Sequence, residues 1–292
     1  MRELFLPDLD AAIRFYDAAG IPPPGGGSGA LPLVFIHGLG CAAADFVEAV
    51  RAPRLIAHRT ILIDLLGFGF SDRPDAFTYT LDAHAAAVLR VVDALRLEHA
   101  LLFGHSMGGA IAVRCAAARP DLFAGLILAE PRLGPGPGML SGPVAAQSES
   151  AYVNGGHAAL VRECAIRVPG EIRQACYIAR MHLASPLAMH RSACAVVADS
   201  TPTTGAKLAD LALPRTLLYG TQSTIDPSWR AAGDAGVRLV PVAGAGHDMM
   251  HEAPGEFVAA LARAIGALDF VSALSASRVQ ARPAAAPSAR SG

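Results

Sequence analysis

The sequence has no excess of charge of either sign. It carries 24 Lys and Arg residues against 25 Asp and Glu residues, so its formal net charge is -1, and only 17% of its 292 residues are charged. A nucleic-acid partner needs a basic face that displaces counterions, so this composition argues against that class. Because 52% of the residues are hydrophobic, the chain also differs from disordered proteins. Its length suits one large α/β domain with an insertion, or two small domains.

Cysteine is scarce, and its spacing has no recognisable pattern. The number of cysteines is odd, and no two of them form a C-x-x-C pair. Such spacing favours neither a zinc site nor a disulfide framework. We therefore expect reduced thiols in a cytoplasmic protein, with no metal site. The five cysteines are Cys41, Cys115, Cys164, Cys176 and Cys194.

Long apolar runs are also missing. Acidic residues and Pro7 interrupt the N-terminal residues before an apolar core of signal-peptide length can form. The longest stretch without charge, residues 18–44, contains three consecutive prolines, Pro22 to Pro24, and a glycine cluster. We therefore expect neither a signal peptide nor a membrane-spanning helix.

Short apolar runs, by contrast, recur along the chain. Residues 4–6 and 11–18 are expected to form two short strands, possible partners in a hairpin. Six later runs are apolar on both faces, which is typical of strands buried on both sides in a parallel sheet. These runs are residues 31–36, 60–64, 100–104, 125–130, 215–220 and 237–242.

Helical patterns alternate with these strands. Residues 81–95 place their apolar side chains on one stripe after an N-cap at Thr80, and residues 107–119 and 255–268 are also expected to be helical. Such alternation predicts an α/β fold, a mostly parallel sheet with helices on both faces.

Residues 133–213 break the alternation, because they lean towards helix and contain no buried-strand pattern. We therefore divide the chain into four parts. Residues 1–132 form the first part of the core, 133–213 a helical cap insertion, 214–270 the second part of the core, and 271–292 a disordered tail.

The strongest motif is GHSMGG at residues 104–109, where an apolar strand ends and a helix begins. A serine on such a sharp turn has a strained backbone, which lifts its hydroxyl clear of the sheet. Gly104 and Gly108 lack Cβ atoms, so the strand and the helix can close around the turn. The helix N-terminus then favours negative charge at the reacting carbonyl. We interpret Ser106 as the nucleophile.

With this motif the chain resembles the α/β-hydrolase family over about residues 1–270. Other matching pieces are His37-Gly38, the segment GFGFSD at residues 67–72 and GAGH at residues 244–247. The resemblance is greatest to the capped branch, which holds esterases, lactonases, carbon–carbon-bond hydrolases, haloalkane dehalogenases and epoxide hydrolases. The last two use an aspartate nucleophile, so a serine at position 106 implies acyl chemistry.

A serine hydroxyl needs a base to take its proton, and His247 is the candidate. It follows the last strand and a small-residue loop that can carry an imidazole back over the strand ends, and the order with Ser first and His last fits the family. The side chain of His105 is expected to point away from the site. His37 is expected to make structural hydrogen bonds, and His251 to support the loop.

The acid that would orient the histidine is open to two interpretations. Family members usually carry it shortly after the strand that ends here at Gly220, but the expected position holds Ser223. Glu130 ends the strand after the elbow helix, and a charged group there needs a partner. We prefer Glu130, as in the dehalogenase-like branch, and keep Asp226 as the alternative acid.

The resemblance also implies an oxyanion hole made of two backbone amides, those of Leu39 and Met107. No metal or nucleotide motif is present, so we expect no cofactor. The resulting hypothesis is a cofactor-independent serine hydrolase of small, apolar esters or related acyl compounds. Lactone hydrolysis, carbon–carbon-bond hydrolysis and acyl transfer would need the same triad. A ligand-binding receptor that lost turnover is a further alternative, favoured only by the missing aspartate at Ser223.

Overall fold

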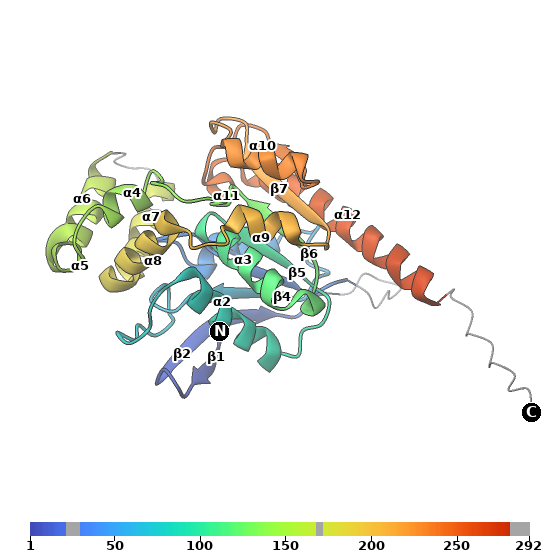
Figure 1. Ribbon diagram of the computed structural model, residues 1–292, viewed down its shortest axis with the longest axis horizontal. Coiled ribbons are helices and arrows are strands. Elements are labelled where there is room, and N and C mark those ends of the chain that lie inside the picture. Colours follow the sequence, from blue (N-terminus) through green and yellow to red (C-terminus); the bar gives the residue numbers. More distant parts are fainter. Residues whose placement is uncertain (22–29, 168–171, 281–292) are drawn as a thin grey trace, which may run out of the picture.

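The computed structural model describes residues 1–21, 30–167 and 172–280. The proline and glycine cluster at residues 22–29 and the last twelve residues, 281–292, lie outside the described residues. The described chain forms an eight-stranded sheet with helices on both faces (Figure 1). The predicted α/β fold class is therefore confirmed.

The sheet is parallel except at one edge. Its strand order is β1-β2-β4-β3-β5-β6-β7-β8. Strands β1 and β2 form the expected antiparallel hairpin, β2 runs antiparallel to β4, and every later pair is parallel. The strands are β1 Arg2–Leu6, β2 Ala11–Ala18, β3 Leu33–Ile36, β4 Thr60–Asp64, β5 Ala100–His105, β6 Phe123–Ala129, β7 Arg215–Gly220 and β8 Arg238–Val242.

The continuous apolar runs are explained by burial on both faces. In β3, Val34 and Ile36 belong to the apolar core on one side of the sheet, whereas Leu33 and Phe35 belong to the core on the other side. Side chains alternate between faces along a strand, so a strand covered on both sides must be apolar at every position.

Helices from different parts of the chain cover the two faces. Helices α2 (Leu81–Ala94) and α3 (Met107–Ala118) contribute to the core that contains Val34 and Ile36. The 3-10 turn η1 (Ala43–Phe46), α1 (Val47–Val50) and α12 (Pro254–Gln280) contribute to the other core. The predicted N-cap is confirmed, because the Thr80 side chain accepts a hydrogen bond from the Ala83 amide at 3.1 Å.

The chain between β6 and β7 is helical in its described part and contains no strand there. Figure 1 shows α4 to α8 grouped beside the sheet, whereas α9 lies over the core near α3. Contacts of α9 with both α3 and α10 agree with that view. The elements are α4 Ser141–Ala145, α5 Glu149–Ala151, the π-helical turn η3 Tyr152–Gly156, α6 His157–Arg167, α7 Ile172–Leu183, α8 Pro186–Ala198 and α9 Thr204–Asp210.

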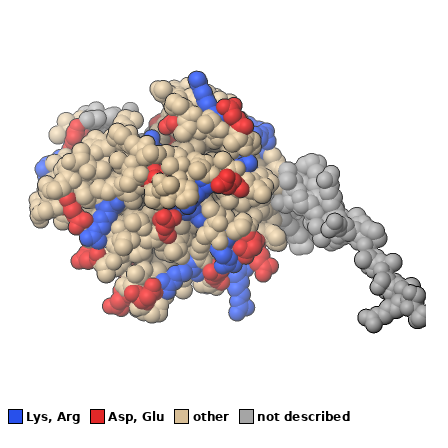
Figure 2. All heavy atoms as spheres, in the orientation of Figure 1, with Lys and Arg blue, Asp and Glu red and all other residues tan. Residues whose placement is uncertain are grey.

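The C-terminal part of the core adds α10 (Pro227–Asp234), α11 (Met249–Glu252) and α12. Helix α12 continues to Gln280, although the sequence pattern gave a helix only to residue 268 and a tail from residue 271. Across the described residues, no helix has both the length and the apolar character that crossing a bilayer requires. Acidic and basic side chains are interspersed over the face seen in Figure 2, and neither sign forms an extended field there.

Candidate active site

Ser106 sits on the sharp turn between β5 and α3. Its backbone angles are φ 54° and ψ -116°, a region that is sparsely populated by residues with a side chain. The turn is held in place by the Ser106 amide, which donates a hydrogen bond to the Ala129 carbonyl at 2.9 Å. This is the local geometry that the motif predicts for a nucleophile elbow.

The two motif glycines are required by close approach of the backbone. A Cβ atom at Gly104 would overlap the Gly108 carbonyl group, and a Cβ atom at Gly108 would overlap the carbonyl group of Ile36. Because the opposing atoms belong to the backbone, no side-chain rotation could relieve these overlaps. The first turn of α3 therefore packs directly against the ends of β3 and β5.

The structure brings Glu130 to His247. The Nδ1 atom of His247 lies 2.8 Å from Oε2 of Glu130, and the other carboxylate oxygen accepts a hydrogen bond from the Gly220 amide at 2.9 Å. The Glu130 side chain is 3% exposed, whereas that of His247 is 43% exposed. The Glu130 carboxylate is thus buried and accepts two hydrogen bonds, whereas the His247 side chain remains partly exposed to solvent.

The electrostatics of this pair favour its charged form. Burial alone would raise the pKa of the Glu130 carboxyl, but hydrogen bonds from His247, Ser223 and the Gly220 amide outweigh burial and lower the pKa. Burial alone would lower the pKa of His247, but its hydrogen bond to Glu130 and the negative charge of Asp248 outweigh burial and raise the pKa. Ser223, at the position where the sequence resemblance predicts an acid, thus donates a hydrogen bond to Glu130.

The elbow and the histidine loop are in contact through His105. Its Nε2 atom lies 2.9 Å from the His247 carbonyl oxygen, and the two rings are 4.8 Å apart between centroids. The expectation that the His105 side chain points away from the site was wrong, because this ring bridges β5 to the loop after β8. In the described chain the Ser106 hydroxyl makes no direct hydrogen bond to His247. Such contacts often tighten only when substrate is bound.

Asp226 lies in a different setting. It is the N-cap of α10 and accepts hydrogen bonds from the Ser228 amide at 2.8 Å and from the Ser228 hydroxyl at 2.6 Å. Its other carboxylate oxygen is 3.7 Å from a guanidinium nitrogen of Arg132. The alternative acid therefore has a local capping function, and the structure does not bring it to His247.

The chain around Leu39 and Met107 lies near Ser106, since Met107 follows Ser106 directly and a Cβ atom at Gly38 would lie 3.3 Å from Cβ of Ser106. Met107 is the first residue of α3, and Leu39 lies in the turn after His37-Gly38. Among the described residues, neither amide donates a hydrogen bond to another protein group. Both are therefore free to donate to a ligand.

The structural role expected for His37 is confirmed, since Nδ1 lies 2.8 Å from the Gly38 carbonyl and Nε2 accepts from the Leu65 amide at 3.1 Å.

Side chains of the inserted helices close over the turn that contains Leu39. A Cβ atom at Gly40 would lie 3.5 Å from the Met189 methyl group and 3.6 Å from Cγ of Met181. Both methionines are fully buried. The nearby Cys41 is also buried, and burial raises the pKa of its thiol, so this cysteine is not an activated nucleophile.

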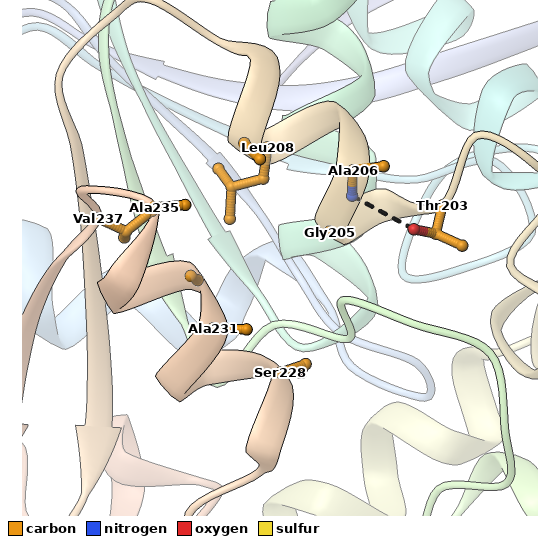
Figure 3. A pocket seen from close by; sticks show the side chains of 10 residues that line it. Thr203, Gly205, Ala206, Leu208, Ser228, Ala231, Ala235 and Val237 are labelled. Atoms are coloured by element: carbon orange, nitrogen blue, oxygen red, sulfur yellow. Dashed lines mark hydrogen bonds between the residues drawn. The ribbon is translucent and has the colours of Figure 1, made fainter.

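A separate cavity of about 230 Å³ lies between α9 and α10 (Figure 3). Its lining consists mainly of small apolar side chains, such as Ala231, Ala235 and Val237, and includes none of the predicted site residues. Within the described part of the chain, no group of three His, Cys, Asp or Glu side chains is arranged to hold a metal ion.

Curated proteins with similar sequences include hydrolases and haloalkane dehalogenases. The profile of the alpha/beta hydrolase family matches residues 33–261. The 2-hydroxymuconate semialdehyde hydrolase of Pseudomonas sp. (strain CF600) is 38% identical over 114 residues, which are 38% of this chain and 40% of that protein. Haloalkane dehalogenase 2 of Mycobacterium tuberculosis (strain ATCC 25618 / H37Rv) is 34% identical over 97 residues, 33% of this chain and 34% of that protein. The aligned segments thus span less than half of either curated relative.

Solved structures resemble the chain over nearly its whole length. An esterase from Exiguobacterium antarcticum superposes with a TM-score of 0.75 at 22% identity, covering 90% of this chain and 98% of that one. The enol-lactonase from Burkholderia xenovorans LB400 superposes with a TM-score of 0.73 at 18% identity, covering 91% of this chain and 100% of that one. At these identities the similarity concerns the fold.

Proposed function

Because this chain belongs to the alpha/beta hydrolase family, we propose that it is a serine hydrolase that cleaves small carboxylic esters or related acyl compounds. The triad of this proposal is Ser106, His247 and Glu130. The observation that carries it is the 2.8 Å hydrogen bond between His247 and the buried Glu130. The loop that contains His247 also contacts His105, the residue before Ser106. A reaction on this triad needs no cofactor.

In the first half of the reaction, the Ser106 hydroxyl attacks the substrate carbonyl carbon while Nε2 of His247 takes its proton. The carbonyl oxygen becomes an oxyanion that accepts hydrogen bonds from the amides of Leu39 and Met107. His247 then gives its proton to the departing alcohol oxygen, and the acyl group remains on Ser106. Glu130 accepts a hydrogen bond from the Nδ1–H group of His247 throughout and stabilises the imidazolium.

In the second half, His247 takes a proton from a water molecule, and the resulting hydroxyl attacks the acyl carbon. The same two amides hold the second oxyanion. When this intermediate collapses, Ser106 recovers its proton from His247 and the carboxylic acid leaves. As part of the same proposal, residues 133–213 act as a cap that bounds the substrate pocket over the core formed by residues 1–132 and 214–270.

Hydrolysis of a different acyl compound on the same triad is the second candidate. It is favoured by the similarity to a hydrolase of 2-hydroxymuconate semialdehyde and by the fold shared with an enol-lactonase. Since ester, lactone and carbon–carbon-bond hydrolysis all need a serine, a base and an oxyanion site, the lining of the pocket would distinguish them.

A fluorophosphonate probe and a substrate panel test the proposal. We expect the probe to label Ser106 in the folded wild-type protein and not in S106A. A panel of p-nitrophenyl esters, lactones and vinylogous diketones then identifies the class that is turned over. Folded protein that neither labels at Ser106 nor hydrolyses any of the three classes would overturn the proposal and favour a ligand-binding role.

A further inference from the structure

The carboxylate of Asp45 joins its own loop to two segments that are distant in the sequence. Its Oδ1 atom lies 2.8 Å from Nη2 of Arg180 and 2.6 Å from Nε2 of His251. Its Oδ2 atom accepts a hydrogen bond from the Ala42 amide at 2.9 Å. Arg180 belongs to α7 of the inserted helices, His251 to α11 just after the proposed base, and Ala42 to the loop that contains Leu39.

The Asp45–Arg180 pair is buried and charged, whereas His251 is 26% exposed. The Asp45 side chain is 3% exposed, and that of Arg180 is 10% exposed. Nε2 of His251 also lies 3.3 Å from Nη2 of Arg180, so the three side chains contact one another. Burial alone would raise the pKa of Asp45, but the hydrogen bond from His251 and the charge of Arg180 outweigh burial and lower the pKa. One ionised carboxylate thus serves two donors on one oxygen.

We propose that Asp45 is a positioning residue that holds the Leu39 loop, the His247 loop and helix α7 in one arrangement. Each of the three contacts fixes a different part of the site. The Ala42 contact fixes the turn that presents the Leu39 amide, the His251 contact fixes α11 and the loop before it, and the Arg180 contact fixes α7 over that turn. The effect of this arrangement on catalysis rests on the proposed function, whereas the coupling of α7 and α11 through Asp45 does not.

The low exposure of the Asp45–Arg180 pair gives the coupling its strength. If α7 moved away from the core, the ion pair between Arg180 and Asp45 would break in a region from which water is excluded. This is strongly unfavourable, because it leaves a buried charge without a partner. Nε of Arg180 is buried and has no hydrogen-bond partner, so no other contact of that atom would compensate for the loss. Movement of α7 away from the core therefore requires that the contact between Arg180 and Asp45 breaks.

Hydrogen exchange tests the coupling without reference to activity. We expect D45N to raise amide exchange in both α7 and α11 by roughly tenfold or more, because both contacts lose their charged acceptor. A matched control is D17N, since Asp17 also holds two arginines, Arg2 and Arg59, but pairs with the first half of β4 away from the site. D17N should leave exchange in α7 and α11 unchanged.

Two further variants separate the contacts and keep the test usable if D45N fails to fold. R180M should raise exchange in α7 more than in α11, and H251N should raise exchange in α11 more than in α7. The separation is not complete, because Nη2 of Arg180 also lies 3.3 Å from Nε2 of His251. If R180M and H251N both leave exchange within about twofold of wild type, the positioning role is wrong. The same holds if D17N raises exchange in α7 and α11 as strongly as D45N does.

Kinetics with an ester that the wild type hydrolyses give a second readout. R180M should raise KM by roughly fivefold with little change in kcat, because α7 covers the binding side. H251N should lower kcat by roughly fivefold with little change in KM, because its contact supports the base loop. Equal effects of both variants on kcat and KM would contradict separate contacts. Absence of wild-type turnover on all three substrate classes, together with absence of probe labelling at Ser106, would overturn the proposed function and leave the exchange result to decide on Asp45.

Discussion

His247 and Glu130 are 117 residues apart in the sequence, and yet Nδ1 of the histidine lies 2.8 Å from Oε2 of the glutamate. Glu130 follows β6, and His247 lies in the loop after β8. Because β6, β7 and β8 are parallel neighbours, the chain leaves all of them at the same edge of the sheet. The pair therefore forms at the edge where Ser106 leaves β5.

Glu130 and Asp226 can be distinguished by isosteric amides. E130Q should lower kcat on a good ester by roughly 10³- to 10⁴-fold, because the amide neither fixes the Nδ1 proton nor stabilises the imidazolium. D226N is the matched control, and it should change kcat by less than about twofold, since Asp226 caps α10. Steady-state kinetics on both variants check this. A larger loss in D226N than in E130Q would reverse the assignment of the acid.

The pH profile of kcat/KM reports the charges around His247, because this ratio follows the protonation of the free enzyme. The base must be neutral to accept a proton, so kcat/KM should rise with pH through a midpoint above 6.5, the ordinary pKa of histidine, because neighbouring carboxylates raise the pKa of His247. D248N removes one of these charges and keeps the hydrogen bond to Glu130. It should therefore move the midpoint to lower pH while preserving the plateau value. An unchanged midpoint in D248N would contradict this electrostatic account.

Two glycine-to-alanine variants distinguish two effects of a Cβ atom on the free energy of unfolding, namely overlap with a neighbouring backbone and the loss of backbone entropy in the unfolded chain. G108A places a Cβ atom against the Ile36 carbonyl and should lower the free energy of unfolding by roughly 1–3 kcal/mol, together with activity. Gly266, on α12, has open space around its Cβ position, so G266A should raise the free energy of unfolding by about 0.5–1 kcal/mol. Denaturant unfolding measures both. Equal stability of the two variants would show that the elbow tolerates a side chain.

A buried ion pair ties the end of α8 to the core. The Asp199 carboxylate lies 2.8 Å from Nη2 of Arg114, and both side chains are almost fully buried. D199N should lower the free energy of unfolding by roughly 3–5 kcal/mol, because it leaves the arginine charge without its buried partner. Asp82 also lies near Arg114 but is 64% exposed, so D82N should cost less than about 1 kcal/mol. Thermal unfolding of both variants measures the difference. Equal melting temperatures of D199N and D82N would contradict it.

The strand positions could be predicted because burial imposes a local pattern. The runs at residues 60–64 and 215–220 coincide with β4 and β7, and the helix expected from residue 81 begins there behind its Thr80 cap. Element ends were less accurate. Helix α12 continues well past residue 268, and residues 269–280 contain neither proline nor glycine, the residues that usually end a helix.

Contacts between distant segments could not be predicted in the same way. The sequence offered Glu130 and Asp226 as acids without a means to measure which one reaches His247. His105 was placed wrongly, because a β5 side chain can be assigned to a face but not to a loop that arrives 142 residues later. Asp45 gave no signal, since a single carboxylate after a glycine turn has no motif.

The amino-acid pattern alone was enough for the family resemblance, the mostly parallel sheet and the sharp turn at Ser106, because periodicity and glycine placement act between residues close in the chain. Only the folded chain decided that Glu130 meets His247, that Asp226 caps a helix, and that Asp45 gathers Arg180 and His251. The physical reason is that these contacts depend on where separate loops leave a common sheet edge, and that placement is a property of the assembled core.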